Sequence, residues 1–251
     1  MSADRPFVLT IAGLDPSGGA GILADIKTFE QHKVTGFAIA TANTIQTENK
    51  FHDIEWIDLP FVIKSIETLF ASYKIEVVKI GIVPSIEYLS EIISAIKLQS
   101  PATQIVWDPV LKSTTKFEFM AIEDYSYLHK ILSKIDLITP NYNEIEILFP
   151  GFISKNLGPR NEIPTAVLLK GGHNESAIGT DRLFLKNEVL DLLPTHEKCF
   201  EKHGSGCVLS SAIASNLALN QTISEACKNA KIYIEKYLSS TPTLIGYHYV
   251  Q

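Results

Sequence analysis

Cysteine is scarce in this sequence. Cys199, Cys207 and Cys227 are the only three among 251 residues, and no two of them form a CxxC pair. Three cysteines leave one over in any pairing, which disfavours a disulfide framework like that of small secreted domains and favours a reducing compartment. The opening residues MSADRPF also lack the charged and apolar regions of a secretory signal. We therefore expect a cytoplasmic protein.

Basic clusters and long apolar runs are missing as well. The 22 Lys and Arg residues are scattered among 28 Asp and Glu residues, which gives a formal net charge of −6. Surfaces that bind nucleic acids or anionic membranes need clustered positive charge, so we expect neither partner. No apolar run reaches the roughly 20 residues that a membrane-spanning helix requires.

The residues that are abundant predict a globular α/β protein. Hydrophobic residues make up 45% of the chain and charged residues 20%, which is typical of a soluble protein with a large core. The apolar run FVLTIA, residues 7–12, is followed by helical spacing over residues 22–32. Buried strands that alternate with helices indicate a mostly parallel sheet covered on both faces. Because the chain contains no linker or repeat, we expect one domain over residues 1–251.

The same alternation continues to the end of the chain. Further strands are expected at residues 36–45, 76–83, 104–110, 135–140 and 165–172, with a strand pair at 181–194. Helices are expected at residues 60–73, 84–97, 207–219 and 223–238, the last preceded by a capping box of Thr222 and Glu225. Ligands of open α/β sheets bind at the carboxyl ends of the strands, so the polar stretches there are the candidate site.

The first such stretch is AGLDPSGGAG, residues 12–21. It lacks the Gly-Lys-Ser/Thr ending of a P-loop and does not match the dinucleotide fingerprint. Its glycines let the backbone approach a ligand closely, and Asp15 offers a carboxylate to N–H or O–H groups on a polar ring. An aspartate that only stabilises the turn before the proline explains Asp15 equally well.

Three further stretches carry polar residues at strand ends. Asp108 ends the run QIVWD and can either face a cation or cap a turn. Asn141 and Glu144 share one face at the start of a helix, where they can organise a hydrated Mg²⁺ or simply cap the helix. Lys170 ends another apolar run, where its ammonium group can meet a phosphate or lie on the surface.

The stretch HGSGC precedes a predicted helix. Gly204 and Gly206 free backbone N–H groups to point at one spot, and the helix dipole adds positive potential there, which suits an anion. The same potential is expected to lower the pKa of the Cys207 thiol, so that it can accept a proton, although a cysteine here can also be a small buried hydrophobe. Cys199, His203 and Cys207 recur every four residues like metal ligands, but the glycines interrupt a helix and no fourth zinc ligand is near.

In this order, the motifs resemble those of the hydroxymethylpyrimidine and phosphomethylpyrimidine kinases of thiamine biosynthesis. The stretches LTIAGLDPSGGAGILADIKTF and HGSGCVLSSAIA are close to family signatures, with KIG, DPV, LITPNYNEIEIL and LLKGGH between them. The resemblance covers nearly the whole chain and implies a ribokinase-like three-layer α/β/α sandwich with a mostly parallel central sheet. It further implies ATP-dependent phosphorylation of 4-amino-5-hydroxymethyl-2-methylpyrimidine and then of its monophosphate. ATP and Mg²⁺ are the implied cofactors, and family members are often homodimers.

The resemblance also assigns expected roles to individual residues. The residues implied in aminopyrimidine binding are Gly13, Asp15, Thr44, Gln46, Ile82 and Val110. Those implied at the nucleotide are Asn141, Lys170, Asp181, Gly204 and Gly206, and those implied at Mg²⁺, partly through water, are Asp108, Asn141 and Glu144. Catalysis would use Cys207 as the base, Gly204, Ser205 and Gly206 as the anion hole, and Lys170.

Several segments depart from the family pattern. Ser205 stands where the family usually has threonine, and Thr44 replaces a usually apolar side chain. The loop at residues 111–119 lacks the usual glycine, residues 156–164 leave little room for a full helix, and the ending at residues 242–250 only faintly matches the family's. These departures leave the exact acceptor and the second phosphorylation open.

Two alternatives to the pyrimidine kinase remain. A pyridoxine or pyridoxal kinase on the same scaffold would also phosphorylate a hydroxymethyl group on an aromatic ring, and Thr44, Gln46 and the loop after Val110 would discriminate between the two. A non-catalytic pyrimidine-binding module is the other alternative. Retention of the whole phosphoryl-transfer set counts against it, since a binding module has no need of that set.

Overall fold

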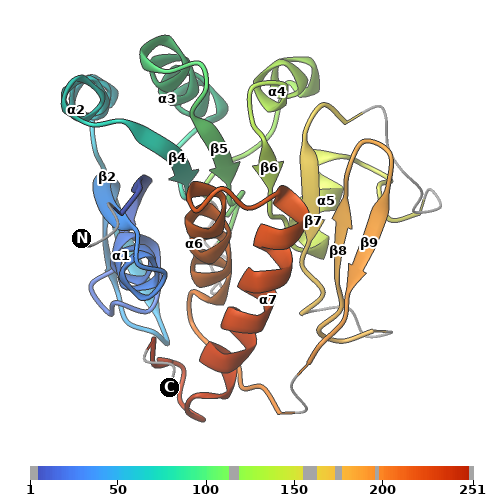
Figure 1. Cartoon of the computed structure of the whole chain (residues 1–251). Helices are drawn as coiled ribbons and strands as arrows, with labels where there is room; N and C mark the ends of the chain where they lie inside the picture. Colours follow the sequence, from blue (N-terminus) through green and yellow to red (C-terminus); the bar gives the residue numbers. More distant parts are fainter. Residues whose placement is uncertain (1–4, 113–118, 155–162, 173–176, 196–197, 249–251) are drawn as a thin grey trace.

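The central sheet has nine strands in the part of the chain that the structure describes. The computed structural model describes residues 5–112, 119–154, 163–172, 177–195 and 198–248. The strands follow the order β3-β2-β1-β4-β5-β6-β7-β8-β9, and Figure 1 shows the part of the sheet from β4 to β9. Strands β2, β1, β4, β5, β6 and β7 run parallel, and β3, β8 and β9 each pair antiparallel with their neighbours. The strands are β1 (Phe7–Leu14), β2 (Thr35–Gln46), β3 (Phe51–Trp56), β4 (Ile75–Ile80), β5 (Gln104–Trp107), β6 (Leu137–Ile138), β7 (Ala166–Leu169), β8 (Asp181–Phe184) and β9 (Val189–Leu192).

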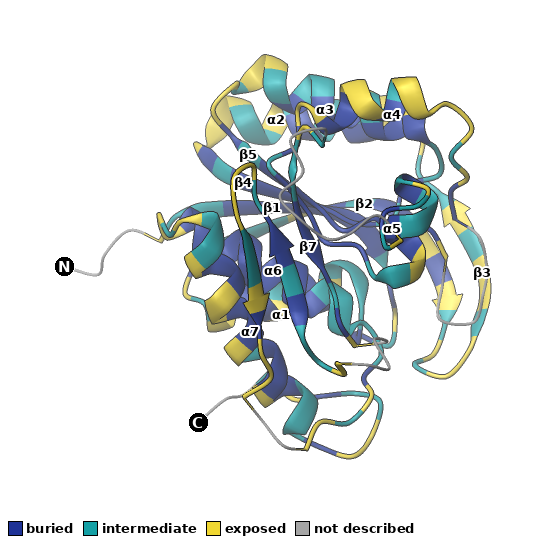
Figure 2. Cartoon of the chain, turned by 90° about the vertical axis from the view of Figure 1, so that its right-hand side faces the viewer, coloured by how far each residue is buried: buried dark blue, intermediate teal, exposed yellow. Residues whose placement is uncertain are grey.

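Helices cover both faces of this sheet, so the predicted three-layer arrangement is confirmed (Figure 2). One face carries α1 (Gly21–Gln31), α6 (Ser205–Ala218) and α7 (Ile223–Ser239), and we refer to it as the α6 face. The opposite face, which we refer to as the α3 face, carries α2 (Leu59–Ser72), α3 (Ile86–Gln99), α4 (Tyr125–Leu132) and α5 (Tyr142–Leu148). Among the described residues, no helix combines the length and apolar character needed to span a membrane.

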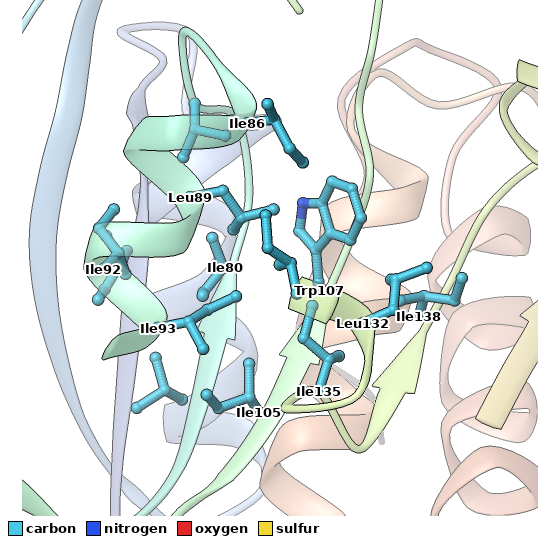
Figure 3. Close-up of a cluster of buried hydrophobic side chains, with 14 of the residues drawn as sticks. Ile80, Ile86, Leu89, Ile92, Ile93, Ile105, Trp107, Leu132, Ile135 and Ile138 are labelled. Carbon is cyan, nitrogen blue, oxygen red and sulfur yellow. The ribbon is translucent and has the colours of Figure 1, made fainter. Parts of the chain in front are cut away.

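Strand alternation divides the core into two clusters. Successive side chains of a strand point to opposite faces. On β1, Leu9 and Ile11 therefore join the α3 face, whereas Val8 packs on the α6 face. Figure 3 shows the centre of the α3 face, where Trp107 lies among branched aliphatic side chains of α3 and the neighbouring strands. Two separate apolar layers thus hold the sheet in place, and its strand ends are free to carry the polar residues.

Most predicted elements are present, and two were missed. The hairpin of β8 and β9 and the capping box of Thr222 and Glu225 are confirmed. Helix α6 begins at Ser205, two residues earlier than predicted, because Gly204 adopts a left-handed conformation that starts it there. Strand β3 was missed because FHDIEW is a partly exposed edge strand with little apolar periodicity. Helix α4 was also missed; the Asp124 side chain caps it by accepting two backbone N–H bonds.

Candidate active site

The two glycine-rich stretches of the sequence lie against each other. Gly204 has a φ of 71°, a left-handed conformation that favours glycine. A Cβ at this position would clash with the backbone of Gly19 and Ala20. His203, the preceding residue, places its Nε2 atom 2.8 Å from Oδ2 of Asp15. The fold therefore joins the turn after β1 to the start of α6 at the carboxyl ends of the parallel strands.

Asp15 is a buried carboxylate held by several donors. Its Oδ1 atom accepts a hydrogen bond from the Ser17 N–H at 2.9 Å. Its Oδ2 atom accepts from the Ser17 hydroxyl at 2.7 Å and from the Ala20 N–H at 3.0 Å, and it also meets His203. Burial alone would raise the pKa of Asp15, but these hydrogen bonds outweigh it and lower the pKa. Asp15 does stabilise its turn, as the simpler explanation predicted, while Oδ1 keeps capacity for a further donor.

Three of the residues predicted at the aminopyrimidine come together at the ends of β1, β2 and β4. Gly13 packs so closely on Ile82 that a Cβ would clash with the Ile82 side chain. The Thr44 hydroxyl donates to the Leu14 carbonyl at 2.9 Å, which satisfies the hydroxyl in a position where an apolar residue was expected. A larger residue at position 13 would therefore displace the Ile82 side chain.

The other two predicted pocket residues lie at neighbouring strand ends. Gln46 is the last residue of β2 and pairs with Phe51 of β3. Val110 lies in the turn after β5, where its N–H donates to the Asp108 carbonyl at 2.8 Å. The loop at residues 113–118, which bears on acceptor choice, lies outside the described residues, as does most of the segment 156–164.

A second cluster surrounds Asp108 and Lys170, from the ends of β5 and β7. Lys170 Nζ lies 3.0 Å from Asp108 Oδ1, and Thr139 and Ser210 also donate to this carboxylate. Burial would raise the pKa of Asp108, but the ammonium groups of Lys170 and Lys79 lower it. Burial would likewise lower the pKa of Lys170, but the neighbouring carboxylates raise it. The cluster is therefore a charged pair at neutral pH.

The start of α6 faces this pair. A Cβ on Gly206 would lie 3.1 Å from Lys170 Nζ and 3.5 Å from Asp108 Oδ2. Glycine thus lets the backbone of the first turn approach the ammonium group. The positive end of the helix dipole and the Lys170 charge together favour an anion at this point.

Asn141 and Glu144 form a capping box at the start of α5. Asn141 Oδ1 accepts from the N–H groups of Asn143 and Glu144, both at 2.9 Å, and Glu144 Oε2 accepts from the Asn141 N–H at 2.7 Å. The Glu144 carboxylate also lies 3.8 Å from Lys170 Nζ. Burial raises the pKa of Glu144 to about 7, against the opposing effect of Lys170. The helix-cap explanation therefore describes both residues, and Glu144 in addition faces the Lys170 cluster.

The donor set suits a hydrated cation more than a complete protein cage. Within the described ranges, no group of three or more His, Cys, Asp or Glu side chains could hold a metal ion. Asp108 and Glu144 flank the same ammonium group, and two carboxylates with water and phosphate oxygens are the ligands Mg²⁺ prefers. The Asn141 side-chain oxygen already accepts two backbone hydrogen bonds, so its part is to fix Glu144.

Asp181 holds the turn that follows Lys170. Its Oδ1 atom accepts from the Gly171 N–H at 2.7 Å, and its Oδ2 atom lies 3.0 Å from Lys231 Nζ on α7. Lys231 also lies 3.3 Å from Glu235, so a buried ionic group anchors this turn to α7. Lys231 and Glu235 were missed by the sequence analysis because they lie on a helix that otherwise has an ordinary apolar stripe.

Cys207 lies in the first turn of α6 and is partly buried. The N–H of Gly21, the first residue of α1, donates to its sulfur. Burial raises the pKa of the thiol to about 11, more than the Lys79 ammonium and the Gly21 N–H lower it. The prediction of a lowered pKa is therefore wrong, because it counted the helix dipole and not the loss of water.

Lys79 and Asp25 are the charged residues that the sequence analysis missed here. Both are fully buried, and Lys79 Nζ lies 2.8 Å from Asp25 Oδ2. A signal was present, because Lys79 interrupts the apolar run EVVKIGIV and Asp25 lies within the stripe of the first helix. A charge inside an apolar pattern indicates a buried partner.

Comparison with known proteins gives one family. The family profile described as phosphomethylpyrimidine kinase matches residues 15–250. The hydroxymethylpyrimidine/phosphomethylpyrimidine kinase of Aquifex aeolicus is 32% identical over 246 residues, which cover 95% of this chain and 96% of that protein. The probable thiamine biosynthetic bifunctional enzyme of Oryza sativa is 32% identical over 250 residues. The match covers 96% of this chain, which spans less than half, 45%, of that longer protein.

Solved structures agree with the fold. The phosphomethylpyrimidine kinase of Clostridium difficile superposes with a TM-score of 0.75 at 35% identity, covering 92% of this chain and 98% of that one. The pyridoxal kinase of Staphylococcus aureus in complex with ADP gives a TM-score of 0.76 at 23% identity, covering 94% of this chain and 89% of that one. The second likeness concerns the fold alone. The predicted ribokinase-like architecture is confirmed.

Proposed function

Because the chain belongs to the phosphomethylpyrimidine kinase family, we propose that it transfers the γ-phosphoryl group of ATP to 4-amino-5-hydroxymethyl-2-methylpyrimidine. A second transfer to the monophosphate would give the pyrophosphate. One observation carries the proposal: Lys170, Asp108 and the first turn of α6 converge at one edge of the sheet. Phosphoryl transfer asks mainly for positioning and neutralisation of charge, which is what such a cluster supplies.

The first turn of α6 serves as the anion hole. Backbone N–H groups of Gly204, Ser205 and Gly206, with the helix dipole, stabilise the negative charge of the transferring group. Lys170 contacts the phosphates, and Asp108 keeps its ammonium group in place. Asp181 fixes the turn after Lys170 that borders the nucleotide.

Mg²⁺ would be held near Lys170 by the carboxylates of Asp108 and Glu144, partly through water. Asn141 orients Glu144 through the capping box, which also brings it next to the nucleotide. When bound, the ion neutralises phosphate charge. Because burial raises the pKa of Glu144 to about 7, the chain gains metal affinity as the pH rises through neutrality.

The aminopyrimidine would lie at the ends of β1, β2, β4 and β5. The free capacity of Asp15 Oδ1 suits the amino group of the ring, and Gln46 offers an amide to a ring nitrogen. The residues that would line the remaining pocket are Gly13, Thr44, Ile82 and Val110.

Cys207 acts as the base in this scheme. The hydroxymethyl O–H gives its proton to the Cys207 sulfur, the freed oxygen bonds to the γ-phosphorus, and the bond to ADP breaks. This requires a thiolate, which the burial of the sulfur disfavours and neighbouring positive charge favours. In this scheme, neighbouring positive charges favour the thiolate form of Cys207.

The enzyme is proposed to act as one domain over residues 1–251, in the cytoplasm, as a homodimer. A single continuous sheet carries both the residues around Asp15 and those around Lys170, which supports the single domain. Light scattering would measure the mass of the particle, and a mass of about one chain would reject the dimer.

Product analysis tests the activity. The purified protein is incubated with Mg-ATP and either the pyrimidine or pyridoxal, and products are identified by mass. The Lys170→Met variant, purified in parallel, controls for contaminating kinases. A pyrimidine monophosphate followed by a pyrophosphate supports both steps, and a monophosphate alone limits the proposal to the first. A product from pyridoxal alone, or pyrimidine binding without product, would contradict it.

A further inference from the structure

The Lys79–Asp25 pair belongs to a fully buried polar group beneath the catalytic end of the α6 face. Asp25 Oδ2 accepts from Lys79 Nζ at 2.8 Å and from the Thr10 hydroxyl at 2.6 Å. Its Oδ1 atom accepts from the Ser211 hydroxyl at 2.5 Å. All four residues have an exposed fraction of 0%. The group therefore ties together β4, β1, α1 and α6 away from the protein surface.

The same group sets the register of α1 against α6. Ser211 follows Cys207 by one turn of α6, and Asp25 follows Gly21 by one turn of α1. Residues four apart lie on the same side of a helix. The contact of Gly21 with Cys207 and the contact of Asp25 with Ser211 thus join α1 to α6 at two points that are one helical turn apart. A shift of α6 that changes the Asp25–Ser211 contact would therefore also change the Gly21–Cys207 contact.

Stability alone does not account for the pair. Removing two charges from water costs more than their attraction returns in many proteins, and apolar replacements of similar size are often neutral or stabilising. The opposite face of the same sheet shows that this chain can fill such space with aliphatic side chains, since Val78 and Ile80 flank Lys79 there. The buried Lys79 ammonium group is better explained by a role for the pair at the nearby first turn of α6, which carries Cys207.

We propose that the Lys79–Asp25 pair is a positioning element for Cys207, which holds the first turn of α6 in register through Ser211. This inference rests on the proposed function in one respect only, the use of Cys207 as a base. The predicted reactivity of the thiol itself is independent of any substrate.

Several charged groups besides the Lys79–Asp25 pair act on the Cys207 thiol. The charged and titratable groups that act on its thiol from the elements packed against it are Lys79, Asp25, Asp108, Lys170 and Tyr237. Lys79 favours the thiolate more strongly than either Asp25 or Asp108 disfavours it. Loss of Lys79 and Asp25 together is therefore expected to leave Cys207 less reactive.

The test replaces both partners, because removing one would leave the other buried and unpaired. In the Lys79→Met/Asp25→Asn double variant, alkylation of Cys207 by iodoacetamide at pH 8 without substrate is measured by mass spectrometry of the digest. Exposed Cys199 in the same digest is the internal control. We expect Cys207 to react about tenfold more slowly, since one pKa unit is a tenfold change in thiolate. The Cys199 rate should stay unchanged, with a thermal midpoint close to that of the parent.

Kinase activity gives the second readout. The double variant is expected to lose kcat by a similar factor, about tenfold, while the KM for ATP stays nearly constant. A folded double variant with parental Cys207 alkylation and kcat would overturn the proposal and leave the pair a structural feature. If wild-type protein phosphorylates no pyrimidine, the proposed function fails, yet the alkylation contrast still decides the present inference.

A milder variant decides the matter if the double variant does not fold. Ser211→Ala removes only the hydroxyl that links Asp25 to α6. We expect Cys207 alkylation to slow at least about twofold, because the first turn of α6 loses its register with Gly21. Ser215→Ala, one turn further and bonded only within its helix, is the matched control and should react like the parent. Equal rates in Ser211→Ala and Ser215→Ala would contradict the proposal.

Discussion

The two faces of the central sheet are built from different materials. The α3 face is filled mainly by large branched aliphatic side chains, with some aromatic ones, and Figure 3 shows the aliphatic side chains around Trp107. The α6 face contains many alanines and several buried charges, among them Asp25, Lys79 and Lys231. The α3 face is an ordinary hydrophobic core, whose side chains contribute to stability and carry no candidate chemistry. The α6 face has smaller apolar side chains and more buried polar groups. These polar groups extend to the strand ends, where the candidate catalytic residues lie.

A single strand illustrates the division. Along β4, Val78 and Ile80 point into the α3 face, and Val77 and Lys79 point toward α6. The comparison predicts that substitutions on the α3 face change stability and leave turnover intact. Those at the strand-end groups and charges of the α6 face should change turnover more than stability.

The largest effect on turnover is expected from Cys207→Ala. Removal of the proposed base should lower kcat by about 10² to 10⁴-fold, with ATP binding measured by calorimetry retained. Cys227→Ala is the matched control, because Cys227 is a fully buried cysteine on the same face with no part in the proposed chemistry. It should keep the parental kcat and lose only about 1 kcal/mol of unfolding free energy. Near-parental turnover in Cys207→Ala would show that the base is another group.

On the α3 face, Ile93→Ala should show the opposite pattern. Ile93 is 1% exposed, and loss of its side chain leaves a cavity that is expected to cost about 2–5 kcal/mol of unfolding free energy. Denaturant titration measures this loss, and kcat is measured well below the unfolding transition. Leu98→Ala on the same helix, where Leu98 is 82% exposed, should change neither. A tenfold fall in kcat for folded Ile93→Ala would break the division between the faces.

Gly206→Ala tests the approach of α6 to Lys170 with a smaller expected effect. The added methyl group would lie 3.1 Å from Lys170 Nζ, so the ammonium group must shift. We expect kcat/KM to fall about tenfold, as small misplacements of catalytic groups commonly do. Gly172→Ala is the control, since no described atom lies within 4 Å of its added Cβ. Equal losses in both variants would point to the turn after β7 as a whole.

The smallest effect concerns pH. Burial lowers the pKa of His248, which lies beside Tyr233 and Tyr237, to about 4. In the unfolded chain a histidine titrates near 6.5, so unfolding takes up a proton between these values. The contribution of neutral His248 is complete above about pH 6.5 and is lost as the pH falls toward 4. His248→Gln should therefore show a flatter fall of the thermal midpoint between pH 7 and 5. Parallel curves would contradict this assignment.

The sequence predicted the parallel strands and the glycine-rich turns at their ends because both depend on local pattern. Continuous apolar runs marked the buried strands, and glycines marked the turns at their ends. Edge strand β3 escaped this reasoning because its pairing with β2, and not its own periodicity, makes it a strand. Interactions between distant residues escaped as well. The pairing of Asp25 with Lys79, and of Asp15 with His203, depends on how the layers stack.

The state of Cys207 is the clearest case of what local reasoning cannot supply. The helix start is visible in the sequence, and its dipole lowers the pKa of a thiol. How much water the fold removes from that thiol is a property of three layers together, and here it outweighs the Lys79 ammonium and the Gly21 N–H, which lower the pKa. The same holds for Glu144, whose raised pKa comes from burial and not from its place in a capping box.

The most direct test of the account is a crystal structure with the pyrimidine and a non-hydrolysable ATP analogue bound. We predict that the hydroxymethyl oxygen lies within about 3.5 Å of the Cys207 sulfur, a hydrogen-bond distance for proton transfer to sulfur. The γ-phosphate should lie between Lys170 and the backbone of residues 204–206. A pyrimidine bound with its hydroxymethyl group turned away from Cys207, or phosphates bound away from Lys170, would contradict the central claim that the chemistry belongs to the α6 face.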